Sequence, residues 1–162
     1  MLTSSLLLLL LTPASLAATL YYDWSIGFVT AAPDGFSRQI IGINGQWPCP
    51  VIEGTVGDTV TINITNNLGT QSTGLHFHGI SQSGSPVMDG PSGVTQCPVP
   101  PGASFTYTFQ VSFPSWTWWT WLMEIQLNNP GTFWYHSHNN GQYPDGLRGR
   151  IHFTICKPLK VS

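Results

Sequence analysis

Strict alternation of apolar and polar residues over TVTINITN, residues 59–66, most limits what this chain can fold into. Successive side chains of a β-strand point to opposite faces, so Val60, Ile62 and Ile64 share one face. Asn63 and the threonines fall on the other face. The pattern predicts a strand whose apolar face packs on a core and whose polar face points outward.

Other short runs rich in β-branched and aromatic residues are separated by glycine, proline and asparagine turn signals. No helical periodicity longer than a turn or two interrupts them. With 162 residues, the chain has the size of one domain. We therefore predict an all-β sandwich of about seven short strands. The prolines of residues 47–58 limit that segment to an edge strand or a loop, and a closing strand is possible over 151–155. The other expected strands are 19–30, 37–43, 59–66, 73–80, 104–110 and 131–138.

The first residues have the features of a secretory leader. Six leucines, residues 6–11, precede Ser15-Leu16-Ala17, a small-x-small cleavage pattern. This apolar run is shorter than the roughly 20 residues that span a bilayer. We predict a signal peptide over residues 1–17, cut near Ala17 or Ala18, no membrane span, and a secreted or cell-surface protein.

Two further features agree with secretion. Asn63-Ile64-Thr65 is an N-glycosylation sequon on the outward face, so we predict a glycan at Asn63. The odd number of cysteines leaves a free thiol or a partner outside the chain, and the sequence leaves the pairing open. The cysteines are Cys49, Cys97 and Cys156.

Four of the five histidines form two His-x-His pairs, His76 with His78 and His136 with His138. Residues i and i+2 of a strand share a face, so each pair should project together. If the two strands are neighbours, four imidazoles converge. Neutral imidazole is the commonest protein metal ligand, and it suits copper and zinc. Two surface pairs without a metal are the weaker interpretation.

Other kinds of partner and site fit less well. Only 7% of residues are charged and the net charge is −2, which argues against nucleic acid. The first histidine pair is followed by Gly79-Ile80-Ser81 rather than by the Asp-His found in some zinc hydrolases. A blue-copper site needs a cysteine thiolate beside two histidines, and neither Cys97 nor Cys156 is followed closely by a histidine.

Four long motifs between about Tyr22 and Gly149 resemble the N-terminal domain of the multicopper oxidases, including laccases and fungal ferroxidases. This resemblance implies a Greek-key β-sandwich of cupredoxin type, the first of three such domains, extending here over residues 18–156. The motifs are NGQWPCPVIEGTVGDTVTINITN, GLHFHGI, MDGPSGVTQCPVPPG and GTFWYHSHNNGQYPDGLRG.

The resemblance also implies a role for each site residue. His76 would bind a type-2 copper, His78 and His136 would share one type-3 copper, and His138 would bind the other. Asp89 in MDG would be a carboxylate near this trinuclear copper cluster that helps protons reach reduced oxygen; a simple turn role is the alternative. Cys97 is similar to a cysteine that in many laccases bridges to the C-terminal domain.

The implied activity is one-electron oxidation of a substrate, a phenol or ferrous iron, coupled to reduction of dioxygen to water. The chain supplies four of the family's eight cluster histidines and has no type-1 copper site, so we expect no oxidase activity from it alone. The other half would come from a C-terminal cupredoxin domain. A secreted, non-enzymatic copper- or zinc-binding module and a non-functional fragment of a mis-spliced gene remain the alternatives.

A tryptophan-rich stretch, residues 111–129, departs from the family pattern. It holds four of the seven tryptophans. One interpretation is a loop that contacts a membrane or a substrate. We favour the other, translation of a retained intron, because loops of this length are uncommon in compact domains. The last residues, 157–162, read as a tail. Finally, we expect Arg148 to pair with Asp145 across a turn.

Overall fold

The computed structural model describes residues 17–111 and 130–155. The predicted signal peptide apart from Ala17, the tryptophan-rich stretch after Val111, and the C-terminal segment with Cys156 lie outside the described residues. Val111 itself is buried, and its N–H donates to the carbonyl oxygen of Asp58 at 2.8 Å. It therefore packs with the domain that precedes it.

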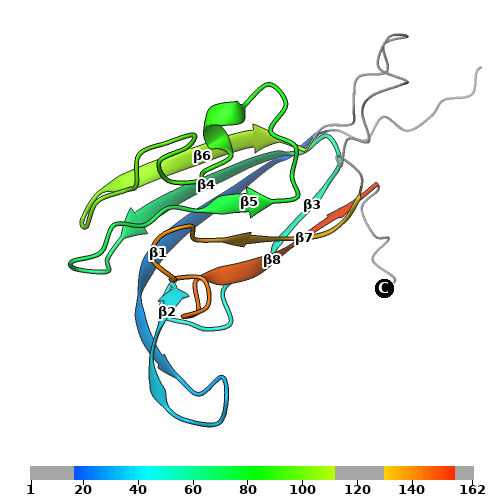
Figure 1. Ribbon diagram of the computed structural model, residues 1–162. Helices are drawn as coiled ribbons and strands as arrows, with labels where there is room; N and C mark the ends of the chain where they lie inside the picture. Colours follow the sequence, from blue (N-terminus) through cyan, green and yellow to red (C-terminus); the bar gives the residue numbers. More distant parts are fainter. Residues whose placement is uncertain (1–16, 112–129, 156–162) are drawn as a thin grey trace, which may run out of the picture.

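Eight strands over the described residues form two four-stranded sheets that face each other, which confirms the predicted all-β Greek-key sandwich (Figure 1). One sheet has the order β2-β1-β4-β6 and the other β3-β8-β7-β5. The strands are β1 (Thr19–Ala31), β2 (Arg38–Ile43), β3 (Ile52–Thr55), β4 (Thr59–Asn66), β5 (His76–His78), β6 (Ser104–Gln110), β7 (Gly131–His136) and β8 (Arg148–Thr154).

The chain crosses repeatedly from one sheet to the other, because β3 and β5 leave the sheet that holds β2, β4 and β6. Two pairings are parallel, β1 with β4 and β3 with β8, and the others are antiparallel. The segment limited by prolines supplies only β3, at an edge, as predicted. Within the described residues, the one helical element is a 3₁₀ turn at Pro86–Met88, and no helix there could cross a membrane.

The core lies between the sheets and follows the alternation of β4. Val60, Ile62 and Ile64 are all fully buried, as predicted, and they face apolar side chains of the other sheet. Burial of such side chains contributes about 25 cal/mol per Å² of apolar surface. Tyr107 on β6 is also fully buried, and its hydroxyl accepts a hydrogen bond from the N–H of Leu75, just before β5, at 2.9 Å. The core thus holds the start of β5 in place.

Three strand boundaries differ from prediction. The strand expected over 73–80 is confined to His76–His78, and the one expected over 131–138 ends at His136. In the closing strand, Ile155 is 64% exposed and lies beyond the end of β8. Local alternation does not reveal where the pairing with a neighbouring strand ends.

The predicted ion pair between Arg148 and Asp145 is wrong. Asp145 pairs instead with Arg38, across 2.5 Å, at the end of the β1–β2 hairpin. The guanidinium of Arg148 donates to the main-chain carbonyls of Tyr143 and Pro144. Sequence proximity favoured the nearer arginine, whereas folding brings the β2 arginine to the same carboxylate.

Candidate metal centre

Pairing of β5 with β7 brings the two histidine pairs together. His76 lies directly opposite His136 in the antiparallel register, with Phe77 opposite Tyr135. Phe77 and Tyr135 are fully buried between the sheets, so the histidines of β5 and β7 project from the outer face. The ring centroid of His76 lies 5.5, 5.4 and 5.1 Å from those of His78, His136 and His138, respectively.

Three of the four imidazoles form a compact group of potential ligands. One ring nitrogen from each of His76, His136 and His138 lies within 4.8 Å of the others. His78 lies outside this group, but its Nδ1 is 3.4 Å from Nε2 of His136. All four histidines predicted from the sequence therefore share one patch.

His138 reaches this patch by a route that strand alternation did not predict. Because β7 ends at His136, His138 lies in the following loop, and the argument from side-chain alternation fails for this pair. The loop is held from beneath by Ser137, whose hydroxyl donates to Oε1 of Gln142 at 2.8 Å and accepts from the N–H of Asn139 at 3.0 Å.

Gln142 is the centre of a buried polar network under this loop. Its Oε1 also accepts from Thr73 Oγ1 at 2.8 Å, and its Nε2 donates to Gln71 Oε1 and to the carbonyl of Ser72 at 3.1 and 3.0 Å. Gln142 is 2% exposed and Thr73 is fully buried. Buried polar groups need such partners, so this network fixes the path between His136 and His138. Sequence reasoning did not identify Gln142, because nothing local marks a glutamine as buried.

Main-chain carbonyls orient two of the rings. Nδ1 of His76 lies 2.8 Å from the carbonyl oxygen of Asp89, and Nδ1 of His136 lies 3.0 Å from that of Ser137. A carbonyl oxygen only accepts, so Nδ1 carries the hydrogen in each ring and the lone pair remains on Nε2, which in His136 faces Nδ1 of His78. Rings held in this way are typical of histidines that bind metals.

Asp89 lies beside the cluster. Its Oδ1 is 3.3 Å from Nδ1 of His76, in addition to the contact made by its main-chain carbonyl. The approach depends on Gly90, which has φ of +90°, and where an added Cβ would lie 1.7 Å from the carbonyl oxygen of Leu75. Only glycine fits there, which explains the MDG sequence as a close approach to β5.

The surroundings favour neutral imidazoles. Burial lowers the pKa of His136, and the charges of His76, His138 and His78 lower it further, against an opposing effect of the hydrogen bond to Ser137. Burial likewise lowers the pKa of His138, together with His76 and His78, while Asp89 raises it. Neutral rings offer the lone pairs that a metal requires.

An indole ring covers one side of the cluster. Trp134 stacks on His136 with ring centroids 4.0 Å apart, and Tyr143 lies 5.2 Å from the same imidazole. These rings bury His136 to 4% exposure even though it projects from the outer face. His78 and His138 remain exposed. The cluster therefore has one covered side and one open side.

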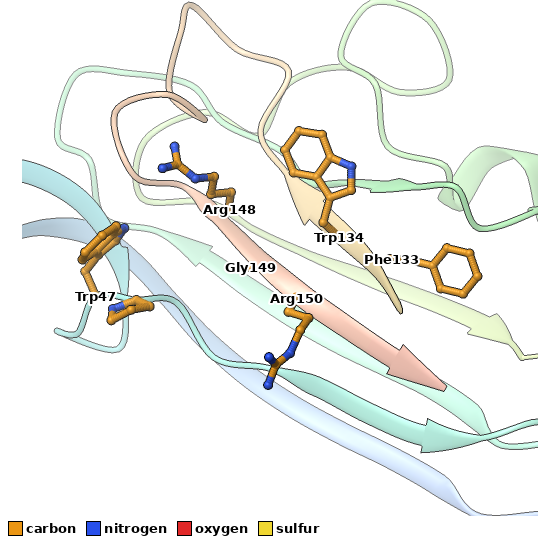
Figure 2. Close-up of a pocket in the computed structure, with 7 residues that line it drawn as sticks. Trp47, Phe133, Trp134, Arg148, Gly149 and Arg150 are labelled. Atoms are coloured by element: carbon orange, nitrogen blue, oxygen red, sulfur yellow. The ribbon is translucent and has the colours of Figure 1, made fainter. Parts of the chain in front are cut away.

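An open groove of about 290 Å³ continues from Trp134 over the same sheet (Figure 2). Trp47, from the β2–β3 connection, lies at one side and Trp134 at the other, with Arg148 and Arg150 of β8 between them. Phe133, Pro48 and Gly149 complete the lining. The outer face of this sheet thus joins the imidazole cluster to an apolar groove bordered by two cations.

Asn63, a further predicted site, lies on the other sheet. Asn63 projects from the outer face of the first sheet, half-buried, and its Nδ2 donates to Asp23 Oδ1 at 2.9 Å. Cys49 is buried and Cys97 is exposed, and neither forms a disulfide among the described residues. Burial raises the pKa of the Cys49 thiol.

A Greek-key sandwich with four imidazoles converging on one outer face defines a metal-binding domain of cupredoxin type. The multicopper oxidase family profile matches residues 25–155. The chain is 56% identical over 136 residues to the iron transport multicopper oxidase fetC of Epichloe festucae, covering 83% of this chain and 19% of that protein.

Two solved structures agree. Fet3p, described as a multicopper oxidase that functions in iron import, superposes with a TM-score of 0.72 at 36% identity over 89% of this chain and 24% of that one. The laccase from Botrytis aclada has a TM-score of 0.72 at 40% identity over 85% of this chain and 23% of that one. The chain belongs to the multicopper oxidase family, whose cofactor is copper, and it spans about a fifth of the length of the curated relative above.

Proposed function

We propose that this chain supplies one half of the copper cluster of an oxidase that couples one-electron oxidation of a substrate to reduction of dioxygen to water. The observation that carries the proposal is the convergence of ring nitrogens from His76, His136 and His138 within 4.8 Å. Imidazole nitrogen suits copper, and the Nε2 lone pairs of His76 and His136 fit that role. Copper, when bound, supplies the one-electron chemistry that protein side chains lack.

The four histidines take distinct roles in this proposal. His76 binds the type-2 copper, His78 and His136 share one type-3 copper, and His138 binds the other. The 3.4 Å separation between His78 Nδ1 and His136 Nε2 supports a shared metal for that pair. Four imidazoles leave three metal ions incompletely coordinated, so the remaining ligands come from another domain.

The outer face of the β3-β8-β7-β5 sheet is the surface on which this second domain docks. It carries the open side of the cluster and the groove between Trp47 and Trp134 (Figure 2). Apolar surface of this kind is costly to leave in water and commonly marks an interface. The chain matches 19% of the Epichloe festucae relative, so the rest of that protein is long enough to contain such a domain.

Asp89 moves protons at the cluster in this proposal. Its carboxylate lies 3.3 Å from Nδ1 of His76 and its side chain is 31% exposed, so it contacts both the ring and solvent. Reduction of dioxygen to water consumes protons, and a carboxylate between solvent and the site can deliver them.

We also propose that residues 1–17 direct the chain into the secretory pathway, that residues 18–156 form the folded domain, and that Asn63 carries a glycan. The half-buried Asn63 side chain lies on the outer face of the β2-β1-β4-β6 sheet, whereas the histidines lie on the other sheet, so a glycan at Asn63 leaves the metal centre accessible. Treatment of the secreted chain with an endoglycosidase should reduce its mass, and Asn63→Gln should abolish that change.

Ferrous iron is the proposed electron donor. The chain is 56% identical to a relative named for iron transport and 40% identical to the laccase of known structure. A phenol is the second candidate substrate, and both can be tested on the same protein.

A domain exchange tests the proposed function. Residues 18–155 replace the matching N-terminal region of the Epichloe festucae oxidase, once with the stretch 112–129 and once without it. We expect uptake of oxygen with ferrous iron in at least one chimera, and its loss in the same chimera carrying His136→Ala. A chimera that folds and binds copper in its own C-terminal domain, yet consumes no oxygen in either form, overturns the proposal.

Copper titration of the chain alone separates the proposed half-site from a complete binding module. We expect weak copper binding, because the four histidines provide only part of the ligands that three copper ions require. Tight binding of a single ion, with one electron paramagnetic resonance signal, would identify a mononuclear binding module instead.

A further inference from the structure

Asp58, in the turn between β3 and β4, is a buried carboxylate outside the metal centre. It is 3% exposed. Its Oδ1 accepts from the N–H of Ala18 at 2.8 Å, and its Oδ2 accepts from the N–H of Thr55 at 2.9 Å. A buried carboxylate is costly unless a cation lies beside it. The ion pairs of the described residues are Arg38 with Asp145 and His76 with Asp89, and neither involves Asp58.

The main chain holds Ala18 firmly in this position. Its carbonyl oxygen accepts from the N–H of Thr59 at 2.8 Å, and Thr19 begins the parallel pairing of β1 with β4 opposite Thr59. The β1–β4 pairing that follows Ala18 therefore presents its nitrogen to the Asp58 carboxylate. Any charge placed on that nitrogen would sit 2.8 Å from Oδ1.

The small-x-small pattern Ser15-Leu16-Ala17 ends one residue before this nitrogen. Hydrolysis of the Ala17–Ala18 peptide bond adds one water, leaving a carboxylate on Ala17 and an α-amino group on Ala18. That amine is protonated at neutral pH, since its ordinary pKa is about 7.7–8.0. Cleavage after Ala18 would instead remove the donor that Asp58 binds.

We infer that the leader peptidase of the secretory pathway cuts between Ala17 and Ala18, and that the new α-ammonium of Ala18 forms a partly buried ion pair with Asp58. The inference rests on the secretory leader proposed above and selects one of the two cleavage positions that the sequence leaves open. Asp58 then has the cation that the described side chains do not provide. The processed N-terminus becomes a structural part of the β1–β4 junction.

A cavity of about 330 Å³ adjoins Asp58, lined by Leu20, Glu53 and His152 among others. His152 forms no ion pair with Asp58 among the described residues, and its Nδ1 lies 3.1 Å from the Thr132 hydroxyl.

The first test is the N-terminal residue of the chain secreted from a fungal host, read by mass spectrometry of its first peptide. We expect Ala18. A chain that begins at Thr19, at another residue, or at Met1 overturns the inference.

The second test is the rate at which an N-hydroxysuccinimide ester acylates the α-amine of the folded, metal-free chain. An ion pair holds the proton on the amine, so we expect acylation about tenfold slower than in Asp58→Asn, equivalent to about 1.4 kcal/mol. Asp34→Asn, at an exposed hairpin carboxylate, is the matched control and should leave the rate unchanged.

If Asp58→Asn does not fold, a glycine inserted between Ala17 and Ala18 serves the same purpose. It moves the α-amine one residue away from an intact Asp58, and acylation should accelerate by a similar factor. Equal rates in the insertion variant and the parent chain overturn the ion pair. Both tests omit copper, so their failure is distinct from failure of the proposed oxidase function.

Discussion

Replacement of Gln142 by leucine should strongly destabilise the loop that carries His138. Oε1 of Gln142 accepts from two hydroxyls, Thr73 Oγ1 and Ser137 Oγ, both at 2.8 Å. Thr73 is fully buried and Ser137 is 1% exposed, so neither hydroxyl can turn to water. A buried donor left without an acceptor costs about 1–3 kcal/mol. Two such donors, partly offset by the apolar leucine, give about 2–4 kcal/mol.

Urea unfolding of the metal-free chain measures this loss. Gln110→Leu, at an exposed position on β6, is the control and should change stability by less than about 0.5 kcal/mol. Adding Thr73→Val to Gln142→Leu should recover part of the lost stability, because it removes one of the two buried hydroxyls left without an acceptor. A change below about 0.5 kcal/mol for Gln142→Leu, at an unchanged urea dependence, would refute the network as the support of this loop.

Three further predictions concern the histidine cluster and the strands that carry it. His136→Ala should abolish calorimetrically detectable copper binding while His152→Ala, outside the cluster, retains it; equal binding by both variants would contradict the assignment. The metal-free chain should lose stability as pH falls from 7 towards 5. The pKa values of His136 and His138 are lowered in the folded chain, so below about pH 6.5 the unfolded chain binds protons more readily than the folded chain. A urea midpoint that rises on acidification would contradict this prediction. Gly149→Ala places a Cβ 2.3 Å from the buried ring of Tyr135 and should cost about 1–3 kcal/mol by thermal unfolding, whereas Gly27→Ala, with only ordinary contacts, should cost less.

Much of the sandwich could be predicted from local pattern. The alternation of β4 correctly placed Val60, Ile62 and Ile64 in the core and Asn63 on the outer face. The prolines before β3 correctly limited it to an edge. The ends of strands were less predictable: β5 ends at His78, although its neighbour β7 extends past the paired Trp134 to Gly131.

The convergence of the four histidines was predicted from the sequence, but the way in which they are held together was not. The i, i+2 rule accounts for His76 and His78 on β5, and the pairing of His76 with His136 places the second pair beside them. His138 reaches the cluster from a loop supported by Gln142, a residue that no local signal identified. The same limitation produced the wrong ion pair at Asp145, whose partner Arg38 is distant in sequence.

The sequence by itself determined which side chains share a strand face, because the period of two is a local property of an extended backbone. It also carried the paired imidazoles and the long motifs of the family. Only the tertiary structure decided which strands are neighbours, which loop bends back to the cluster, and that the Ala18 nitrogen meets Asp58. These contacts join residues far apart in the chain, and they form only when two packed sheets bury enough apolar surface to offset the entropy lost in closing the loops between them.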